Sequence, residues 1–160
     1  MPFLPLTELP ALFPHVVSWI KDLDKRARES GRALSPLEQK LARSVGVARP
    51  EDVRILSVPQ IPLPTHLRIR QLAQQIGLLT SNTGGLTAIR GVIVQLTYTN
   101  NPRLLAHEFA HVEQYERFGI EAFLREYIQQ LAKYGYQSAP FEIEAEAKAV
   151  KACRDAGLRI

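Results

Sequence analysis

The chain carries the pattern H-E-x-x-H between His107 and His111, which places two imidazoles and one carboxylate at a fixed spacing. On an α-helix, residues four positions apart lie on one face, one turn from each other, so both imidazoles can reach a single metal ion. Glu108 follows the first histidine, where its carboxylate can reach a water molecule held in the same place. The spacing therefore predicts a metal site with two histidine ligands and with Glu108 as its general base.

The residues around this motif favour the helix that it needs. Pro102 suits the first turn of a helix, residues 103–106 are strong helix formers, and Gly119 offers a stop. We therefore expect one helix from about residue 102 to residue 118, with both histidines on the same face.

Two histidines do not complete a catalytic zinc site, which uses three protein ligands and leaves a fourth position for water. The other two histidines, His15 and His66, precede the motif and fall at expected helix starts. We interpret them as surface or partly packed residues. The single cysteine, Cys153, does not suit a site of two imidazoles and a carboxylate, and we interpret it as a small core residue.

A better source of the third ligand is the acidic stretch between residues 139 and 147, which contains Glu142, Glu144 and Glu146. Pro140 can open a helix here, and Glu142 and Glu146 then share one face while Glu144 points elsewhere. The alternative is that the three carboxylates form a solvated acidic cap, because acidic residues stabilise a helix N-terminus.

These motifs resemble those of the gluzincin class of zinc metallopeptidases, in which H-E-x-x-H is followed by a glutamate ligand. The stretch from Glu142 to Glu146 is similar to the E-x-x-A-[DE] element of the membrane-associated Ste24/HtpX-type enzymes. The resemblance implies that Glu142 is the third zinc ligand and that Glu146 supports a ligand histidine, a position where aspartate is more usual. The helix up to Gln114 is also similar to small bacterial domains with an H-E-x-x-H-x-x-Q helix. The resemblance covers roughly residues 85–152 and does not extend to the membrane spans of the Ste24/HtpX-type enzymes.

The resemblance also implies a peptidase mechanism. Zn²⁺ held by His107, His111 and Glu142 would lower the pKa of its bound water and polarise a peptide carbonyl. Glu108 would take a proton from that water and pass it to the leaving amine. The oxyanion needs a further donor, and three phenols lie near enough in the sequence to supply it: Tyr115, Tyr134 and Tyr136. Each of them is alternatively an amphipathic core or rim residue.

A stretch rich in β-branched residues, 84–98, comes before the metal helix and predicts a strand, in which Arg90 and Gly91 mark a bulge or tight turn. In zincin folds an edge strand runs above the metal helix and pairs with an extended peptide. We expect Val92, Ile93 and Val94 to act as this substrate strand. The alternative is an ordinary hairpin packed on the helix.

The remaining patterns predict an α+β fold with several helices and a small sheet. Four of the 11 prolines fall in residues 1–14, which predicts an irregular arm followed by a helix over 14–30. Ser35 and Glu38 form a capping box that opens a helix ending near residue 46. A strand over 53–58 and helices over 65–77, over 121–134 and from residue 140 onward complete the pattern. We expect a helical N-terminal region, residues 1–60, packed on a compact zincin-like domain, residues 61–160, with a small β-sheet and the active-site helix.

Composition narrows the cellular setting. The 160 residues are 46% hydrophobic and 22% charged, which suits one domain with a proper core. One cysteine excludes an intramolecular disulfide. The N-terminus lacks a signal-peptide pattern, and no apolar run approaches the roughly 20 residues that span a bilayer. We therefore expect a cytoplasmic protein with no membrane partner; export without a signal peptide is the alternative.

The net charge of +4 lies in the first half of the chain. Residues 1–80 carry 11 Lys/Arg against 7 Asp/Glu, while residues 81–160 carry 9 of each. The densest basic cluster, residues 21–32, contains acidic residues and no aromatic residue, so it does not indicate binding to nucleic acid. This basic, proline-rich part suits contact with a protein partner instead.

Together these features predict a zinc-dependent metallopeptidase that acts on a peptide or protein substrate. The alternative is a non-catalytic, zinc-bearing accessory module that acts through a protein partner. A third interpretation is a helical interaction protein in which the motif is accidental. Zinc is the expected metal because two imidazoles and a carboxylate suit it best, although iron, cobalt, nickel or manganese could occupy such a site.

Overall fold

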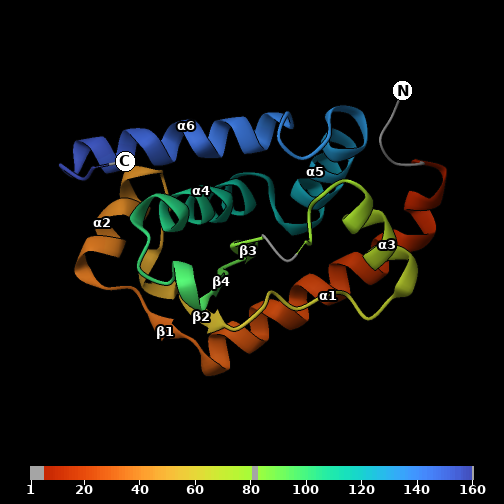
Figure 1. The fold of residues 1–160 in the computed structure, drawn as a ribbon, viewed down its shortest axis with the longest axis horizontal. Coiled ribbons are helices and arrows are strands. Elements are labelled where there is room, and N and C mark those ends of the chain that lie inside the picture. Colours follow the sequence, from red (N-terminus) through yellow and green to blue (C-terminus); the bar gives the residue numbers. More distant parts are fainter. Residues whose placement is uncertain (1–5, 81–82, 160) are drawn as a thin grey trace.

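The computed structural model of the protein describes residues 6–80 and 83–159, where the chain is mostly helical with one small sheet (Figure 1). The helices of this part are α1 Leu9–Ser30, α2 Pro36–Ser44, α3 Leu67–Gln75, α4 Pro102–Phe118, α5 Ile120–Tyr134 and α6 Pro140–Asp155. The strands are β1 Arg32–Ala33, β2 Arg54–Val58, β3 Gly85–Ala88 and β4 Gly91–Gln95, and short 3-10 turns lie at Leu6–Glu8, Pro50–Asp52 and Leu96–Tyr98. The predicted α+β class is confirmed. Within these ranges, no helix has the length and apolar character needed to cross a bilayer.

Local signals account for most of the helix boundaries. The predicted capping box is present at the start of α2, where Ser35 accepts a hydrogen bond from the N–H of Glu38 and the Glu38 side chain accepts one from the N–H of Ser35. The Asn101 side chain caps α4 by accepting a hydrogen bond from the N–H of Leu104 at 3.1 Å. Gly119 ends α4 with a φ of 84°, which side-chain-bearing residues rarely adopt.

Two boundaries differ from the expectation. α1 begins at Leu9, so residues 9–13 of the proline-rich arm are helical; Pro10 lies in the first turn, where its missing N–H has no intrahelical partner to lose. Residues 1–5 of the predicted arm lie outside the described part of the chain. α3 spans Leu67–Gln75, shorter at both ends than the expected 65–77, and His66 before it makes no side-chain cap.

The sheet has the strand order β1-β2-β4-β3. β2 and β4 run parallel, from Arg54 opposite Gly91 to Val58 opposite Gln95, while β1 and β3 pair antiparallel with their neighbours. β4 is therefore an interior strand, and β3 is an edge strand.

The interior position of β4 overturns the predicted substrate strand. Val92, Ile93 and Val94 are fully buried, and their strand pairs with β2 on one side and with β3 on the other. A strand paired on both sides has no free edge that a peptide could join. The edge near α4 belongs instead to β3, which precedes the tight turn at Ile89 and Arg90.

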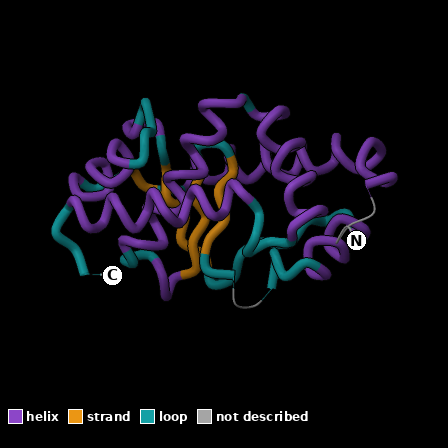
Figure 2. The backbone as a smooth tube through the Cα atoms, turned by 90° about the horizontal axis from the view of Figure 1, so that it is seen from above, coloured by secondary structure: helices purple, strands orange, loops and turns teal. Residues whose placement is uncertain are grey.

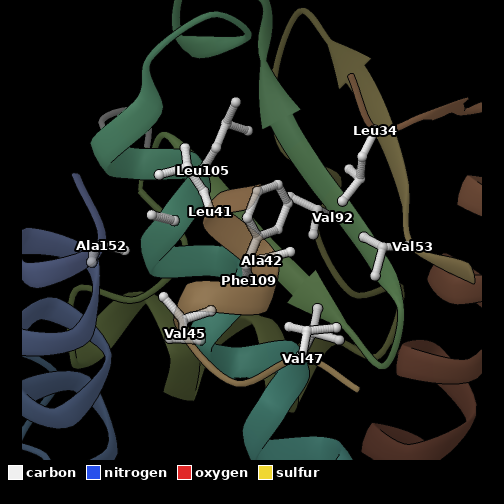
Figure 3. Close-up of a cluster of buried hydrophobic side chains, with 14 of the residues drawn as sticks. Leu34, Leu41, Ala42, Val45, Val47, Val53, Val92, Leu105, Phe109 and Ala152 are labelled. Atoms are coloured by element: carbon white, nitrogen blue, oxygen red, sulfur yellow. The ribbon is translucent and has the colours of Figure 1, made fainter. Parts of the chain in front are cut away.

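The helices cover both faces of the sheet, so that α6, α4, the sheet and α1 follow one another as layers (Figure 1). The view from above shows the strands enclosed by helices (Figure 2). Phe109 points from α4 toward Val92 of β4, within a buried cluster that also holds Leu41 and Ala42 of α2 (Figure 3). Because this face of α4 packs on the sheet, the opposite face is directed at α6.

The expected division at residue 60 needs correction, because the two regions share one sheet and one core. β1 and β2 precede residue 60, while β3 and β4 follow it. A second buried cluster joins Ile20 and Leu23 of α1 with Phe123 and Leu124 of α5. Residues 6–60 therefore share one sheet with β3 and β4 and one core with α4.

Candidate metal centre

α4 and α6 bring three potential ligand side chains to one point. His107 and His111 lie on the α4 face that packs against α6, and Glu142 lies in the first turn of α6, which Pro140 opens. The Nε2 atoms of the two histidines are 3.2 Å apart. Glu142 Oε1 lies 3.1 Å from His107 Nε2, and Glu142 Oε2 lies 2.8 Å from His111 Nε2. These are the three residues that the sequence motifs single out as ligands.

The spacing of these atoms suits a zinc ion. Zinc lies about 2.0–2.2 Å from imidazole nitrogen and carboxylate oxygen, so the corners of its coordination tetrahedron are about 3.3–3.6 Å apart. The two Nε2 atoms, 3.2 Å apart, come within about 0.1 Å of that range, and each of them has a different oxygen of Glu142 nearby, at 3.1 and 2.8 Å. Two nitrogens and a carboxylate are also a donor set that zinc accepts. His107, His111 and Glu142 could therefore hold a metal ion.

We call His107, His111 and Glu142 the ligand group. Contacts on the outer side of the two imidazole rings determine which ring nitrogen faces the centre of this group. His107 Nδ1 lies 2.9 Å from Glu146 Oε2, and His111 Nδ1 lies 2.8 Å from Gln114 Oε1. Both partners are acceptors, so each Nδ1 donates a proton outward and each Nε2 points to the inner side, toward Glu142. Such contacts fix the orientation of ligand histidines in metal sites. Glu146 thus lies beside His107, one of the two candidate ligand histidines.

Gln114 is held as firmly as the histidine that it contacts. Its amide nitrogen donates hydrogen bonds to Phe141 O and to Glu144 Oε1, each at 3.0 Å, so its carbonyl oxygen must face His111. The side chain is fully buried. In the sequence, Gln114 stands three residues after His111 and so shares its helix face, but its partners on α6 cannot be read from that spacing.

Glu108 lies beside the ligand group, on the side of β3. Glu108 is 6% exposed, and its Oε1 accepts a hydrogen bond from Thr87 Oγ1 at 3.1 Å. Gly85 permits this close approach, because a Cβ at that position would lie 3.1 Å from Glu108 Cγ. Burial raises the pKa of Glu108, against the lowering effect of the two nearby histidines. A raised pKa makes the carboxylate a stronger base.

Of the three phenols expected as oxyanion donors, Tyr136 faces the site. It lines the same cleft as His107 and Glu108, close enough to Glu142 for the charge of that carboxylate to act on its hydroxyl. Burial raises the pKa of Tyr136, and the negative charge of Glu142 raises it further. The hydroxyl therefore keeps its proton at neutral pH and can act as a donor.

Tyr115 and Tyr134 do not suit the donor role. Tyr115 is buried, and its hydroxyl already donates to Thr87 O at 3.3 Å. Tyr134 is 42% exposed, with Lys133 Nζ 5.1 Å from its ring centroid. The two expectations are corrected accordingly.

Tyr127 is a site residue that the sequence reading missed. Its hydroxyl donates a hydrogen bond to Glu142 Oε2 at 2.8 Å. Its ring stacks on Phe123 with the centroids 5.4 Å apart. From the sequence alone, the helical periodicity of α5 makes Tyr127 look like an ordinary core residue. Burial raises the pKa of Tyr127, which keeps the hydroxyl available as a donor to the carboxylate.

A polar cleft of about 510 Å³ opens beside His107 and Glu108. Its walls come from the loop after α3, residues 83–85, the start of α4 with its cap, α6 and the loop between α5 and α6. Arg103 stands in this wall and donates a hydrogen bond to Glu146 Oε1 at 2.7 Å. Arg103 therefore positions the Glu146 carboxylate, which in turn contacts His107. The sequence alone did not identify Arg103 as a site residue.

The charges of the ligand group depend on one another. Burial opposes a charged His111, but the negative charge and hydrogen bond of Glu142, together with the charge of Glu108, raise the pKa of His111 to about 9. Burial also opposes a charged Glu142, but the two histidines outweigh it and hold the pKa of that carboxyl below its usual range. Without metal, His111 and Glu142 therefore form an ion pair at neutral pH. The pair contributes fully to stability between the ordinary pKa values of 4.5 and 6.5, and the histidine part of this contribution is lost as the pH rises through about 9.

A metal ion must displace the proton of His111. Because a ligand nitrogen has to be unprotonated, we expect zinc binding at pH 7 to release at least one proton per ion. The affinity should rise about tenfold per pH unit until the pH reaches the pKa of His111. Calorimetric titrations at pH 7 in two buffers of different ionisation enthalpy measure the released protons. Zinc binding without proton release would show that His111 is neutral in the metal-free protein or is not a ligand.

Comparison of the chain with protein-family models, curated proteins and solved structures found no match. The function is therefore inferred from the site itself.

Proposed function

We propose that the protein is a zinc-dependent metallopeptidase of the gluzincin type, with a zincin-like arrangement of metal helix and edge strand. The observation that carries the proposal is the convergence of His107, His111 and Glu142, with an acceptor behind each imidazole and a buried carboxylate beside the group. Zinc bound there would polarise a peptide carbonyl and lower the pKa of a water molecule.

Glu108 acts as the general base in this proposal. Thr87 occupies Glu108 Oε1, which leaves Oε2 to take a proton from the attacking water and to pass it to the leaving amine. Tyr136 donates a hydrogen bond to the carbonyl oxygen as negative charge develops on it. Glu146 and Gln114 keep the two imidazoles oriented throughout.

The start of β3 aligns the substrate backbone. Gln95 N donates to Gly84 O at 2.9 Å, which makes these two residues a hydrogen-bonded pair of the antiparallel ladder. The next residue, Gly85, therefore turns its N–H and C=O away from β4, and it lines the cleft. An extended peptide that pairs with Gly85 passes beside Glu108, so this edge takes the role first expected of β4.

Removal of the metal tests the proposal. Protein loaded with one equivalent of zinc is incubated with a library of fluorescence-quenched peptides, and its zinc content is measured by elemental mass spectrometry. We expect cleavage that 1,10-phenanthroline abolishes and that added zinc restores. A His111→Ala preparation carried through the same purification controls for a contaminating peptidase.

Two results would count against the proposal in different ways. One zinc per chain with no cleavage of any peptide would favour the non-catalytic, zinc-bearing module. A protein that binds no zinc at all would contradict the metal site itself.

A further inference from the structure

The inner side of the candidate metal centre opens onto an apolar cavity of about 80 Å³, the inner cavity, enclosed by α1, β3, α4, α5, the first turn of α6 and the loops after α3 and α5. The polar residues in its wall belong to the site or contact it, and several of their side chains are hydrogen-bonded. Glu108 bonds Thr87, and Tyr127 bonds Glu142. The rest of the wall is formed by large apolar side chains such as Trp19, Phe123 and Leu131.

A second apolar cavity of about 110 Å³, the rear cavity, lies between α1, α3 and α5. The two cavities share five wall residues: Val16, Trp19, Leu78, Ile128 and Leu131. The one charged residue in the rear wall, Glu8, is paired with Arg68 at 2.6 Å. The two apolar cavities are therefore neighbours, and the inner one reaches His111.

The inner cavity also meets the polar cleft. Gly85, Glu108 and Tyr136 line both. Gly85 has no side chain, and a Cβ there would lie 3.1 Å from Glu108 Cγ, so a larger residue would crowd the border between the cleft and the cavity. A group carried by a peptide bound across Gly85 and Glu108 can therefore enter the cavity at the point where the reacting carbonyl lies.

We propose that the inner and rear cavities form a specificity pocket that receives one large apolar side chain of the substrate, such as leucine, methionine or phenylalanine, directly beside the scissile bond. This inference rests on the proposed peptidase function and names its substrate class. Apolar cavities of this size stay dry and gain free energy when an apolar group fills them. A charged side chain would lose its hydration there without finding a partner, so the pocket selects against it.

Binding of a zinc-directed probe tests the pocket without relying on catalysis. The Glu108→Gln protein is loaded with zinc and titrated by calorimetry with two peptide hydroxamates that differ only in one side chain, isobutyl in the first and hydrogen in the second. We expect the isobutyl compound to bind about tenfold to hundredfold more tightly.

Val16→Phe places a larger side chain where both cavities meet. We expect it to reduce the difference between the two hydroxamates to below about threefold, with the affinity of the glycyl compound unchanged. Val16→Leu is a smaller change for the case in which the phenylalanine variant does not fold, and it should reduce the difference partially. Leu67→Phe, at a position on α3 that is 63% exposed and outside both cavities, is the matched control and should change neither affinity.

The outcomes separate the pocket from the peptidase function. Equal affinities of the two hydroxamates overturn the pocket and leave the zinc site intact. A preference that survives both Val16 substitutions overturns its assignment to these cavities. If neither hydroxamate binds to the zinc-loaded protein, the proposed function fails and the pocket fails with it. In the peptide library, a large apolar residue enriched at one position next to the cut supports the pocket independently.

Discussion

Glu108→Gln is expected to lower kcat/KM for peptide hydrolysis by about 10²–10⁴-fold while the zinc content stays at one ion per chain. Glutamine has the shape of glutamate and can keep the contact with Thr87, but its amide cannot take up a proton at neutral pH. Glu108 also lies beside the ligand group of His107, His111 and Glu142 and is not part of it, so the metal should be retained. Steady-state kinetics on a quenched peptide, together with elemental analysis of the same sample, measures both effects.

Glu113→Gln is the matched control on the same helix. Glu113 is about as buried as Glu108, at 8% exposed, but it pairs with Arg117 and Lys148 on the far side of α4 from the cleft. We expect the kcat/KM of the Glu113→Gln protein to remain within about twofold of wild type, because the loss of an ion pair changes the stability of the fold and not the proton transfer. A Glu108→Gln protein that hydrolyses peptides at the wild-type rate would assign the general base to another residue.

The helical half of the site could be predicted because its information is local. The spacing of His107 and His111 places them on one helix face wherever that helix packs. Pro140 likewise sets the start of α6, and with it the face that Glu142 and Glu146 share. That these two faces meet was an inference from resemblance, and the geometry of α4 and α6 agrees with it.

The predicted strand and its turn are present as β3 and β4, but the substrate role given to Val92, Ile93 and Val94 was wrong because sheet order is not a local property. β2 pairs with one edge of β4, and it lies more than 30 residues earlier in the chain. The run Val92-Ile93-Val94 did contain a usable signal: consecutive apolar, β-branched residues are typical of a strand buried on both faces, whereas an edge strand would alternate. Tyr127 was missed for a similar reason, because its role depends on a carboxylate 15 positions later on another helix.

Glu142→Ala is expected to reduce zinc affinity by more than about 100-fold, because it removes a direct ligand. The loss of a residue that only hydrogen-bonds to a metal ligand already costs about 10–100-fold in affinity. It also removes the main negative charge that raises the pKa of His111. Burial then favours the neutral imidazole, so the ion pair that stabilises the metal-free protein near neutral pH is lost as well. Competition titrations with a zinc-binding dye and chemical denaturation of the metal-free protein measure the two effects.

Glu144→Ala distinguishes a ligand from a nearby acidic residue. Glu144 lies two positions further along α6, bonds Gln114 and Arg117, and lies outside the ligand group, so the substitution should leave the zinc affinity within about tenfold of wild type. The two variants remove the same charge from the same helix turn, so a general electrostatic effect would weaken zinc binding equally in both. A selective loss in Glu142→Ala therefore identifies a coordinating carboxylate. Retention of zinc in Glu142→Ala would move the third ligand elsewhere and, with it, the position of the scissile bond relative to Glu108 and the inner cavity.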